Sequence, residues 1–477
     1  MSVMLSATSS AFELRGPEPL AVSPQQQQIA DGTGGPTRAT RQSLACASTA
    51  RWSRLSALLR HHGTTAFGPV SISAANFLAT LALLHWLPSD EFGQFSFALV
   101  VSGLCASLTN GLLGTPLASI ARVPPADAQE ELNTYFKTNL VAALLIAILV
   151  FGVTLPIGMP VGTAAMFGLY SAAMSLRLVA RTYAYTANRV HRVVLSDCVY
   201  SLSMISGVCL VVFVGGARLP EMALMMALGA IFSLIPFGRR YFSVLNRALA
   251  SGSLRGYRRI WRDLTRWTVL GVVTSEMTMN AHAYLVTFIR GPQAFALIAV
   301  GALFMRPFAL VLTALPDREA PAMARTIAAG NIARALKHAK EYLAVVAALW
   351  FANQVLAGSV LIWFPSLVIK PAYGASSVIS VVAIWALISA VRGARAPEIM
   401  LLYAAREFRA LANASVVSSV VALTLTAVLL LVAGPIVSLF GIFGGDVAMW
   451  LAVKAGVRTW RKGCPVAPLL PAPGLTC

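Results

Sequence analysis

An arginine stands in the middle of one of the most apolar stretches of this chain. Arg306 lies near the centre of residues 295–317, directly before Pro307. If that stretch crosses a membrane, a charge at its centre costs at least ~2.5–3.5 kcal/mol, so Arg306 must face a cavity or a partner. A planar guanidinium suits phosphate or pyrophosphate, which it binds through paired hydrogen bonds. A neighbouring carboxylate is the alternative partner, and Arg306 would then serve packing.

A second polar group lies in the preceding apolar stretch, residues 267–289. Glu276 and Asn280 are four residues apart, which places both on one face of a helix, one turn from each other. A carboxylate there could exchange protons and couple the movement of a ligand to a proton or sodium gradient. The alternative is a structural ion pair between Glu276 and Arg306. His282 could relay protons, or it could be a partly exposed polar residue.

Weaker candidates occur earlier in the chain. Asp197, near the start of the stretch at 195–216, is a further candidate for ion coupling. Arg177, toward the end of the stretch at 161–182, could admit a phosphorylated headgroup, or could anchor that end to the membrane surface by snorkelling. Asn76 offers hydrogen bonds of the kind that sugars use, although such residues also hold membrane helices together.

The composition sets the kind of element that must position these residues. Of 477 residues, 57% are hydrophobic and only 12% are charged, whereas soluble domains carry about 25% charged residues. The formal net charge of +19 raises the question of nucleic acid. The basic residues, however, lie in short segments beside apolar stretches, which is how membrane orientation is set, so no nucleic acid is expected as a partner. The composition predicts an all-α polytopic membrane protein.

Apolar stretches of about 20 residues predict twelve transmembrane helices. The first six intervals are 66–87, 94–120, 138–158, 161–182, 195–216 and 220–238. The second six are 267–289, 295–317, 342–363, 375–392, 410–432 and 435–453. Between the two sets lies a basic segment, 239–266.

The basic residues predict the orientation of these helices. With the N-terminus in the cytoplasm, thirty lysines and arginines fall in cytoplasmic segments and three fall on the other side, namely Arg218, Arg290 and Lys370. That asymmetry follows the positive-inside rule and places both termini in the cytoplasm. The expected organisation is a disordered tail (1–50), a six-helix half (51–238), a basic cytoplasmic linker (239–266), a second six-helix half (267–453) and another disordered tail (454–477). Contact with membrane lipids follows from this organisation.

A short internal sequence similarity supports two halves that have the same orientation in the membrane. Phe92 and Arg122 bracket the second predicted helix as Phe295 and Arg325 bracket the eighth, with the same spacing and an alanine before each arginine. Each half contains an even number of helices and begins on the cytoplasmic side. The halves would therefore be parallel repeats around a central cavity, where transporters of this plan hold their substrates.

Three passages carry a resemblance to a known family. LLHWLPSDEFGQFSFALVVSGLCASLTNGLLGTPL (83–117), FIRGPQAFALIAVGALFMRPFALVLTALPDREAPAMAR (288–325) and FPSLVIKPAYGASSVISVVAIWALISAVRG (364–393) resemble the polysaccharide flippases of the multidrug/oligosaccharidyl-lipid/polysaccharide exporter superfamily. The resemblance covers roughly residues 60–460. Two departures exist: the turn at 290–295 lacks an acidic residue, and MNAHAY (279–284) stands where relatives often place an aspartate.

Several expectations follow from this resemblance. The substrate would be an undecaprenyl-pyrophosphate-linked oligosaccharide, flipped across the bacterial inner membrane by alternating access for surface polysaccharide export. A polysaccharide polymerase and a chain-length regulator would be partners. A multidrug or cation exporter of the same superfamily is the first alternative, although the predicted helices offer few carboxylates.

A membrane-embedded polysaccharide ligase or glycosyltransferase is the less favoured alternative, because such enzymes carry a large extracytoplasmic loop and every outside loop here is short. No motif of the chain indicates a catalytic centre or a cofactor. The six cysteines and six histidines form no metal-binding spacing and no disulfide framework. No enzyme activity and no metal are therefore expected.

Overall fold

The computed structural model describes residues 68, 71–118, 125–187, 189–215, 218–367 and 373–463, and within them all regular structure is helical. The tail predicted at 1–50 and residues 464–477 of the tail predicted at 454–477 lie outside the described residues, whereas residues 454–463 belong to α16 and not to a disordered tail. The first half contains a helix at Ser71–Trp86, α2 (Ser89–Thr109), a π-helical segment η2 (Asn110–Gly114), α3 (Thr115–Ala118), α4 (Pro125–Thr154), η4 (Leu155–Ile157), α5 (Val161–Thr186), α6 (Val190–Gly215), α7 (Leu219–Phe232) and η5 (Ile235–Phe237).

The segment between the halves is helical as well. It consists of α8 (Gly238–Ser251), α9 (Tyr257–Ile260) and the π-helical η6 (Trp261–Thr265). The second half contains α10 (Arg266–Arg290), α11 (Pro292–Phe304), α12 (Arg306–Ala328), α13 (Ile332–Trp363), η7 (Pro365–Leu367), α14 (Ala375–Ala404), α15 (Phe408–Val432) and α16 (Pro435–Gly463).

The helices correspond in place to the twelve predicted intervals. Among the described residues, nine helices are long and apolar enough to cross a membrane, and the bent pair α11 and α12 makes a tenth. The helix Ser71–Trp86 is apolar but shorter. Helix α10 has sufficient length, with 25 residues, but carries the polar strip that includes Glu276 and Asn280. The all-helical membrane fold predicted from the sequence is confirmed.

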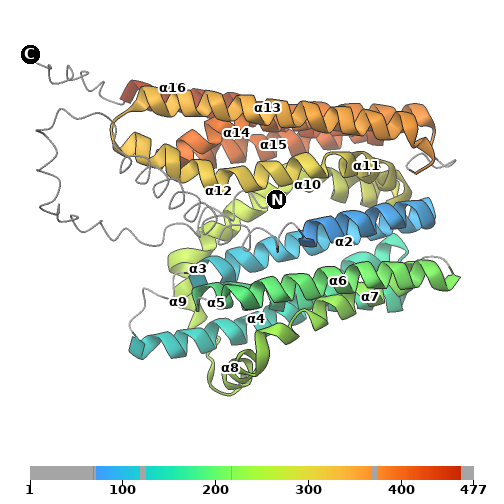
Figure 1. Ribbon diagram of the computed structural model, residues 1–477, viewed down its shortest axis with the longest axis vertical. Helices are drawn as coiled ribbons and strands as arrows, with labels where there is room; N and C mark the ends of the chain where they lie inside the picture. The colour runs from blue at the N-terminus through green and yellow to red at the C-terminus, as the bar shows by residue number, and fades with distance from the viewer. Residues whose placement is uncertain are drawn as a thin grey trace, which may run out of the picture.

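The two halves lie side by side, with the segments drawn blue to green in one and yellow to red in the other (Figure 1). Within the first half α4 packs on α5 and α5 on α7, and within the second α15 packs on α16 and α14 on α16. Between the halves the main contact joins α2 to α11, with a further contact between α2 and α10. Helices α2 and α11 hold equivalent positions in the predicted repeat, as expected for two parallel repeats related by an axis between them.

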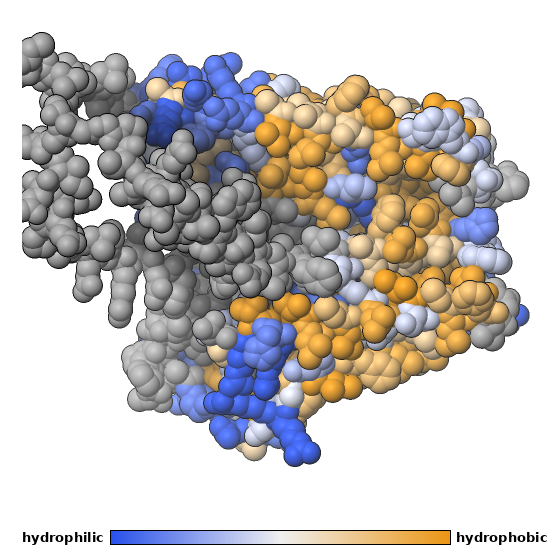
Figure 2. Space-filling model, viewed as in Figure 1, coloured by the Kyte–Doolittle hydropathy of each residue, from blue (hydrophilic) through white to orange (hydrophobic). Residues whose placement is uncertain are grey.

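The face drawn in Figure 2 is mostly apolar along the length of the helices where it is not grey. Phe213 is 87% exposed and Val432 is 81% exposed, with many other large apolar side chains around them. Soluble monomers rarely expose apolar patches of this extent, whereas lipid chains solvate them readily. The surface therefore fits a bilayer.

One membrane crossing is broken at Arg306. Helices α11 and α12 meet at Met305 and form an angle of 57°. Pro307 lies in the first turn of α12, where the missing N–H is tolerated, whereas it would interrupt a continuous helix. The break therefore places Arg306 at the start of a helix within the crossing.

The segment predicted as a basic linker forms packed structure. Tyr241, Val244 and Ala248 recur at helical spacing on α8 and are buried in a cluster with Phe136 of α4. Tyr257 of α9 donates a hydrogen bond from its hydroxyl to the carbonyl of Leu112, 2.6 Å away, within the π-helical part of the second crossing. The segment thus contacts the membrane-spanning body of the first half.

Candidate functional site

Glu276 lies at the contact between the halves. Glu276 is 2% exposed, and the side-chain amide of Asn280 donates a hydrogen bond to its carboxylate at 2.6 Å. The hydroxyl of Ser107 on α2 also interacts with this carboxylate. Among the described residues no ion pair joins Glu276 to a lysine or arginine, so the Glu276–Arg306 pair considered as the alternative is not formed. The group is a buried carboxyl held by neutral donors from both halves.

The same face of α10 continues to Tyr284, one turn beyond Asn280. The ring of Tyr284 packs edge to face against Phe97 of α2, with centroids 6.1 Å apart. Its buried hydroxyl has no hydrogen-bond partner among the described residues. Cys105 of α2 is buried in the same region. The strip is therefore a small polar region enclosed by apolar and aromatic side chains, where a proton or small cation could be exchanged.

Arg306 bridges the halves at a different position. Its guanidinium donates to the Thr80 hydroxyl of the first helix at 3.0 Å, across the interface. The residue is partly buried, and no ion pair links it to any carboxylate in the described part of the chain. The carboxylate partner considered for it is therefore not found. A guanidinium held only by a neutral hydroxyl keeps most of its donors for an anion.

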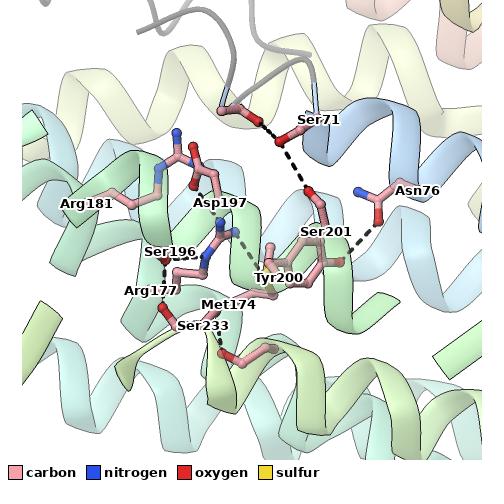
Figure 3. Close-up of polar contacts among 12 residues, drawn as sticks. Ser71, Asn76, Met174, Arg177, Arg181, Ser196, Asp197, Tyr200, Ser201 and Ser233 are labelled. Carbon is pink, nitrogen blue, oxygen red and sulfur yellow. Dashed lines mark hydrogen bonds and ion pairs between the residues drawn. The ribbon is translucent and has the colours of Figure 1, made fainter. Parts of the chain in front are cut away.

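The Arg306 contact leads into a polar network of the first half (Figure 3). Thr80 donates to the main-chain carbonyl of Asn76 at 2.6 Å, and the Tyr200 hydroxyl of α6 donates to the Asn76 side-chain carbonyl at 3.1 Å. Arg177 of α5 lies over the Tyr200 ring, 4.8 Å from its centroid. The Asn76 side chain thus joins the first helix to α6. This is the helix-joining role that the sequence offered as the alternative to sugar binding.

Arg177 belongs to a buried ion-pair cluster, which we call the first node and which consists of Arg177, Arg181 and Asp197. Both arginines bind the same carboxylate oxygen, at 2.6 Å and 2.9 Å respectively. Arg177 is 2% exposed and also donates to the Ser196 hydroxyl at 3.2 Å. The snorkelling expectation for Arg177 is therefore wrong, because its charge is neutralised inside the half. Asp197, a candidate for ion coupling from the sequence, is bound to both arginines of this cluster.

The first helix closes over this node. A side chain at Gly68 would place its Cβ 2.1 Å from the Asp197 carboxylate. The Ser201 hydroxyl of α6 also donates to Ser71, at 3.2 Å. Only a glycine permits this approach. The node therefore fixes the first helix against α6.

The second half contains a similar ion-pair cluster, which was not predicted from the sequence. It consists of Arg392, Arg395 and Asp446, and we call it the second node. Asp446 of α16 is fully buried, and its two carboxylate oxygens bind Arg392 at 2.8 Å and Arg395 at 2.9 Å. Both arginines belong to the thirty basic residues that the positive-inside rule placed in cytoplasmic segments, and both lie inside α14. A signal existed in the sequence: the fourth helix of each half carries two arginines three or four residues apart, and an isolated aspartate interrupts a later apolar stretch.

His282 is a core residue of the second half. It is 4% exposed and contacts the rings of Trp385 and Phe295, with centroids 5.4 Å and 6.1 Å away. The expectation of a partly exposed residue is therefore wrong. His282 follows Glu276 by six residues, so the two side chains leave α10 on different faces and do not form one relay.

The halves meet closely near the start of α2. A Cβ at Gly93 would lie 1.9 Å from the Pro292 carbonyl oxygen. Next to this contact Phe97 of α2 packs against Tyr284, Phe288 and Phe295 of the other half. We call this region the closure. In the predicted orientation it lies on the extracytoplasmic side.

No protein-family model matches the chain, and no curated protein matches it. Solved structures do match it. An inward-facing multidrug resistance MATE family transporter of the MOP superfamily is 12% identical, with a TM-score of 0.65 over 83% of this chain and 96% of that one.

Two further structures show the same fold. The lipid II flippase MurJ in an inward closed conformation is 11% identical, with a TM-score of 0.63 over 83% of this chain and 87% of that one. An outward-facing MATE family transporter is 13% identical, with a TM-score of 0.52 over 84% of this chain and 95% of that one. The fold of the chain is therefore that of MATE and MurJ transporters. The inward conformations resemble it more than this outward one.

Proposed function

We propose that the chain is a flippase that moves an anionic lipid-linked oligosaccharide or polysaccharide precursor across a membrane by alternating access. The observation that carries this proposal is Arg306. It stands at the break of a crossing, contacts the opposite half, and has only a neutral hydroxyl as its described partner. A phosphate or pyrophosphate group would satisfy the remaining guanidinium donors and neutralise the charge.

The position of Arg306 also connects binding with movement. The residue starts α12 in one half and bonds Thr80 in the other. An anion that competes with Thr80 for the guanidinium would weaken a contact that joins the halves. Differential contacts of this kind are what allow a ligand to shift a conformational equilibrium. Asn280 would then act mainly by positioning Glu276, and Asn76 by joining the first helix to Tyr200 of α6, rather than by contacting sugar.

Glu276 is the group that we propose to carry the coupling proton. Its carboxylate is buried between α10 and α2 and is held by Asn280 and Ser107. An ionised carboxylate without a cationic partner is costly in such a place, so relative movement of the halves would change its affinity for a proton.

A cation exporter is the second candidate, and one observation favours it. Glu276 has no arginine or lysine bound to it among the described residues, so its carboxylate could hold a cationic substrate. Arg306 disfavours a cationic substrate, because its positive charge is not paired with a carboxylate among the described residues. The structures that share the fold are transporters, and they lend no support to a ligase or glycosyltransferase.

We further propose a bacterial inner membrane as the location, with the basic ends of the helices and both termini in the cytoplasm. The closure at Gly93 and Pro292 would then face away from the cytoplasm. The structure would correspond to a state closed on that side, in which substrate is loaded from the cytoplasm.

The test is a flipping assay in proteoliposomes with a fluorescent undecaprenyl-pyrophosphate oligosaccharide, beside an efflux assay with a cationic dye. We expect Arg306→Ala to abolish flipping, Arg306→Lys to retain a part of it, and Arg458→Ala, at an exposed arginine of α16, to leave it unchanged. Glu276→Gln should remove the response to an imposed proton gradient.

Three outcomes would count against the proposal. Wild-type flipping by Arg306→Ala would remove Arg306 from the mechanism. Dye efflux that requires Glu276, without flipping, would establish the cation exporter instead. Loss of Arg306→Ala protein from the membrane would make the residue structural.

A further inference from the structure

Helix α8 and the segment after it form a strongly basic surface. Residues 239–262 contain seven arginines and neither aspartate nor glutamate. All seven are exposed, namely Arg239, Arg240, Arg247, Arg255, Arg258, Arg259 and Arg262. A surface patch of positive charges repels itself, so it is favourable only where solvent or an anionic partner compensates the charge.

The surface of α8 has three distinct sides. One side, with Tyr241, Val244 and Ala248, is buried against the first half. Phe242 and Leu249 lie two turns apart on a second side and are 42% and 55% exposed. The three arginines of α8, Arg239, Arg240 and Arg247, lie on the third. The exposed apolar side thus runs between the buried side and the basic side.

The depth of α8 follows from its contacts with α4. Asn133 donates to the Ser251 hydroxyl at 2.9 Å, and Lys137 donates to the Leu249 carbonyl at 3.3 Å. The apolar stretch of α4 that is predicted to cross the membrane begins at residue 138. Helix α8 therefore lies level with the start of that crossing. Figure 1 shows α8 at the edge of the body, and Figure 2, in the same view, shows strongly hydrophilic residues there beside the apolar surface.

We propose that α8 binds anionic phospholipid headgroups at the membrane surface. Phe242 and Leu249 would enter the boundary between headgroups and acyl chains, while Arg239, Arg240 and Arg247 contact lipid phosphates. A helix with an apolar side beside a basic side is the usual form of an interfacial anchor, and anionic lipid strengthens its binding. A nucleic acid or an acidic protein would satisfy the arginines but would leave the two apolar side chains in water. This inference does not depend on which substrate the protein transports.

The test uses the full chain in phosphatidylcholine nanodiscs with a minor fraction of phosphatidylglycerol. Phe242→Trp introduces a reporter at the exposed apolar side, and the parent chain supplies the fluorescence background of its nine native tryptophans. Lipids brominated on the acyl chains quench nearby tryptophan. We expect brominated phosphatidylglycerol to quench the reporter several-fold more than brominated phosphatidylcholine at the same mole fraction.

Charge variants in the reporter background separate headgroup binding from mere proximity. Arg239→Gln, Arg240→Gln and Arg247→Gln together should abolish the preference for phosphatidylglycerol, whereas lysine at the same three positions should keep most of it. High salt should reduce the preference, because these charges are exposed. Equal quenching by both lipids would overturn the proposal, and so would the absence of quenching by either, which would place this side of α8 in water or against another macromolecule. Size-exclusion chromatography confirms that each variant remains folded.

Discussion

Gly93 of α2 lies against the main chain of Pro292, the residue that begins α11 in the opposite half. A Cβ at Gly93 would stand 1.9 Å from the Pro292 carbonyl oxygen, so even alanine requires the two helices to separate. Flexible side chains can move aside for a new methyl group, but main-chain atoms cannot. The closure is thus a contact of backbone on backbone, and it holds only when the halves approach fully.

Gly93→Leu should therefore prevent this closure. We expect the distance between spin labels at the exposed positions Asp90 and Gln293, measured by electron paramagnetic resonance in a cysteine-free chain, to increase and broaden. Gly152→Leu is a matched control, because nothing lies within 4 Å of a Cβ at that helical glycine of α4. Unchanged distances in Gly93→Leu would show that the halves need not meet there.

Removal of the Asp197 carboxylate should destabilise the protein strongly. Asp197→Asn leaves the buried Arg177 and the partly buried Arg181 without their counter-charge, and breaking a buried pair in this way costs roughly 3–5 kcal/mol. The thermal unfolding midpoint in detergent should fall markedly, whereas Ser201→Ala, which removes only one hydroxyl contact with the first helix, should change it little. A midpoint that does not move would mean that the node contributes no stability.

The two nodes should contribute independently. They lie in different halves and share no residue, and substitutions at separate sites without shared partners usually add. Asp446→Asn should lower the unfolding midpoint as Asp197→Asn does, and the double variant should show the sum of both effects. A double variant no worse than either single one would reveal that one half unfolds first and masks the other.

Thr80 should matter through its hydroxyl. Thr80→Val keeps the shape of the side chain but deprives Arg306 of its acceptor, and Thr80→Ser restores the acceptor without the methyl group. If Thr80 positions Arg306, flipping in proteoliposomes should fall about tenfold in Thr80→Val, which corresponds to ~1.4 kcal/mol, and remain near the parent rate in Thr80→Ser. Equal rates in the two variants would rule out a positioning role.

The fold could be predicted from the sequence to a large extent, because hydropathy acts over consecutive residues. Each of the twelve intervals was an apolar stretch of membrane length, so the helices followed directly, whereas the break of one crossing beside Arg306 was not predicted. The helical form of 239–266 was missed because basic residues dominated the interpretation of that segment. The apolar spacing of Tyr241, Val244 and Ala248 was the signal that could have revealed α8.

Pairing was harder to predict, because it depends on which helices become neighbours. Glu276 and Asn280 are one turn apart on one helix, so their contact was accessible from spacing alone. Arg392 and Asp446 belong to different helices and are 54 residues apart, and only the packing of α14 on α16 brings them together. Helix packing also explains why Glu276 and Arg306, which the sequence allowed as a pair, have different partners in the fold.

The nodes have an electrical consequence. Each contains two arginines and one aspartate, so each half holds one net positive charge among its helices when all three groups are ionised. Moving an elementary charge through the full membrane potential changes the energy by roughly 2.3 kcal/mol per 100 mV. Rocking of the halves that displaces these charges along the membrane normal would therefore make the conformational step sensitive to voltage. Transport in proteoliposomes with potassium and valinomycin should then depend on the imposed potential even at equal pH on both sides, and a rate that is independent of potential would mean that the nodes stay at constant depth.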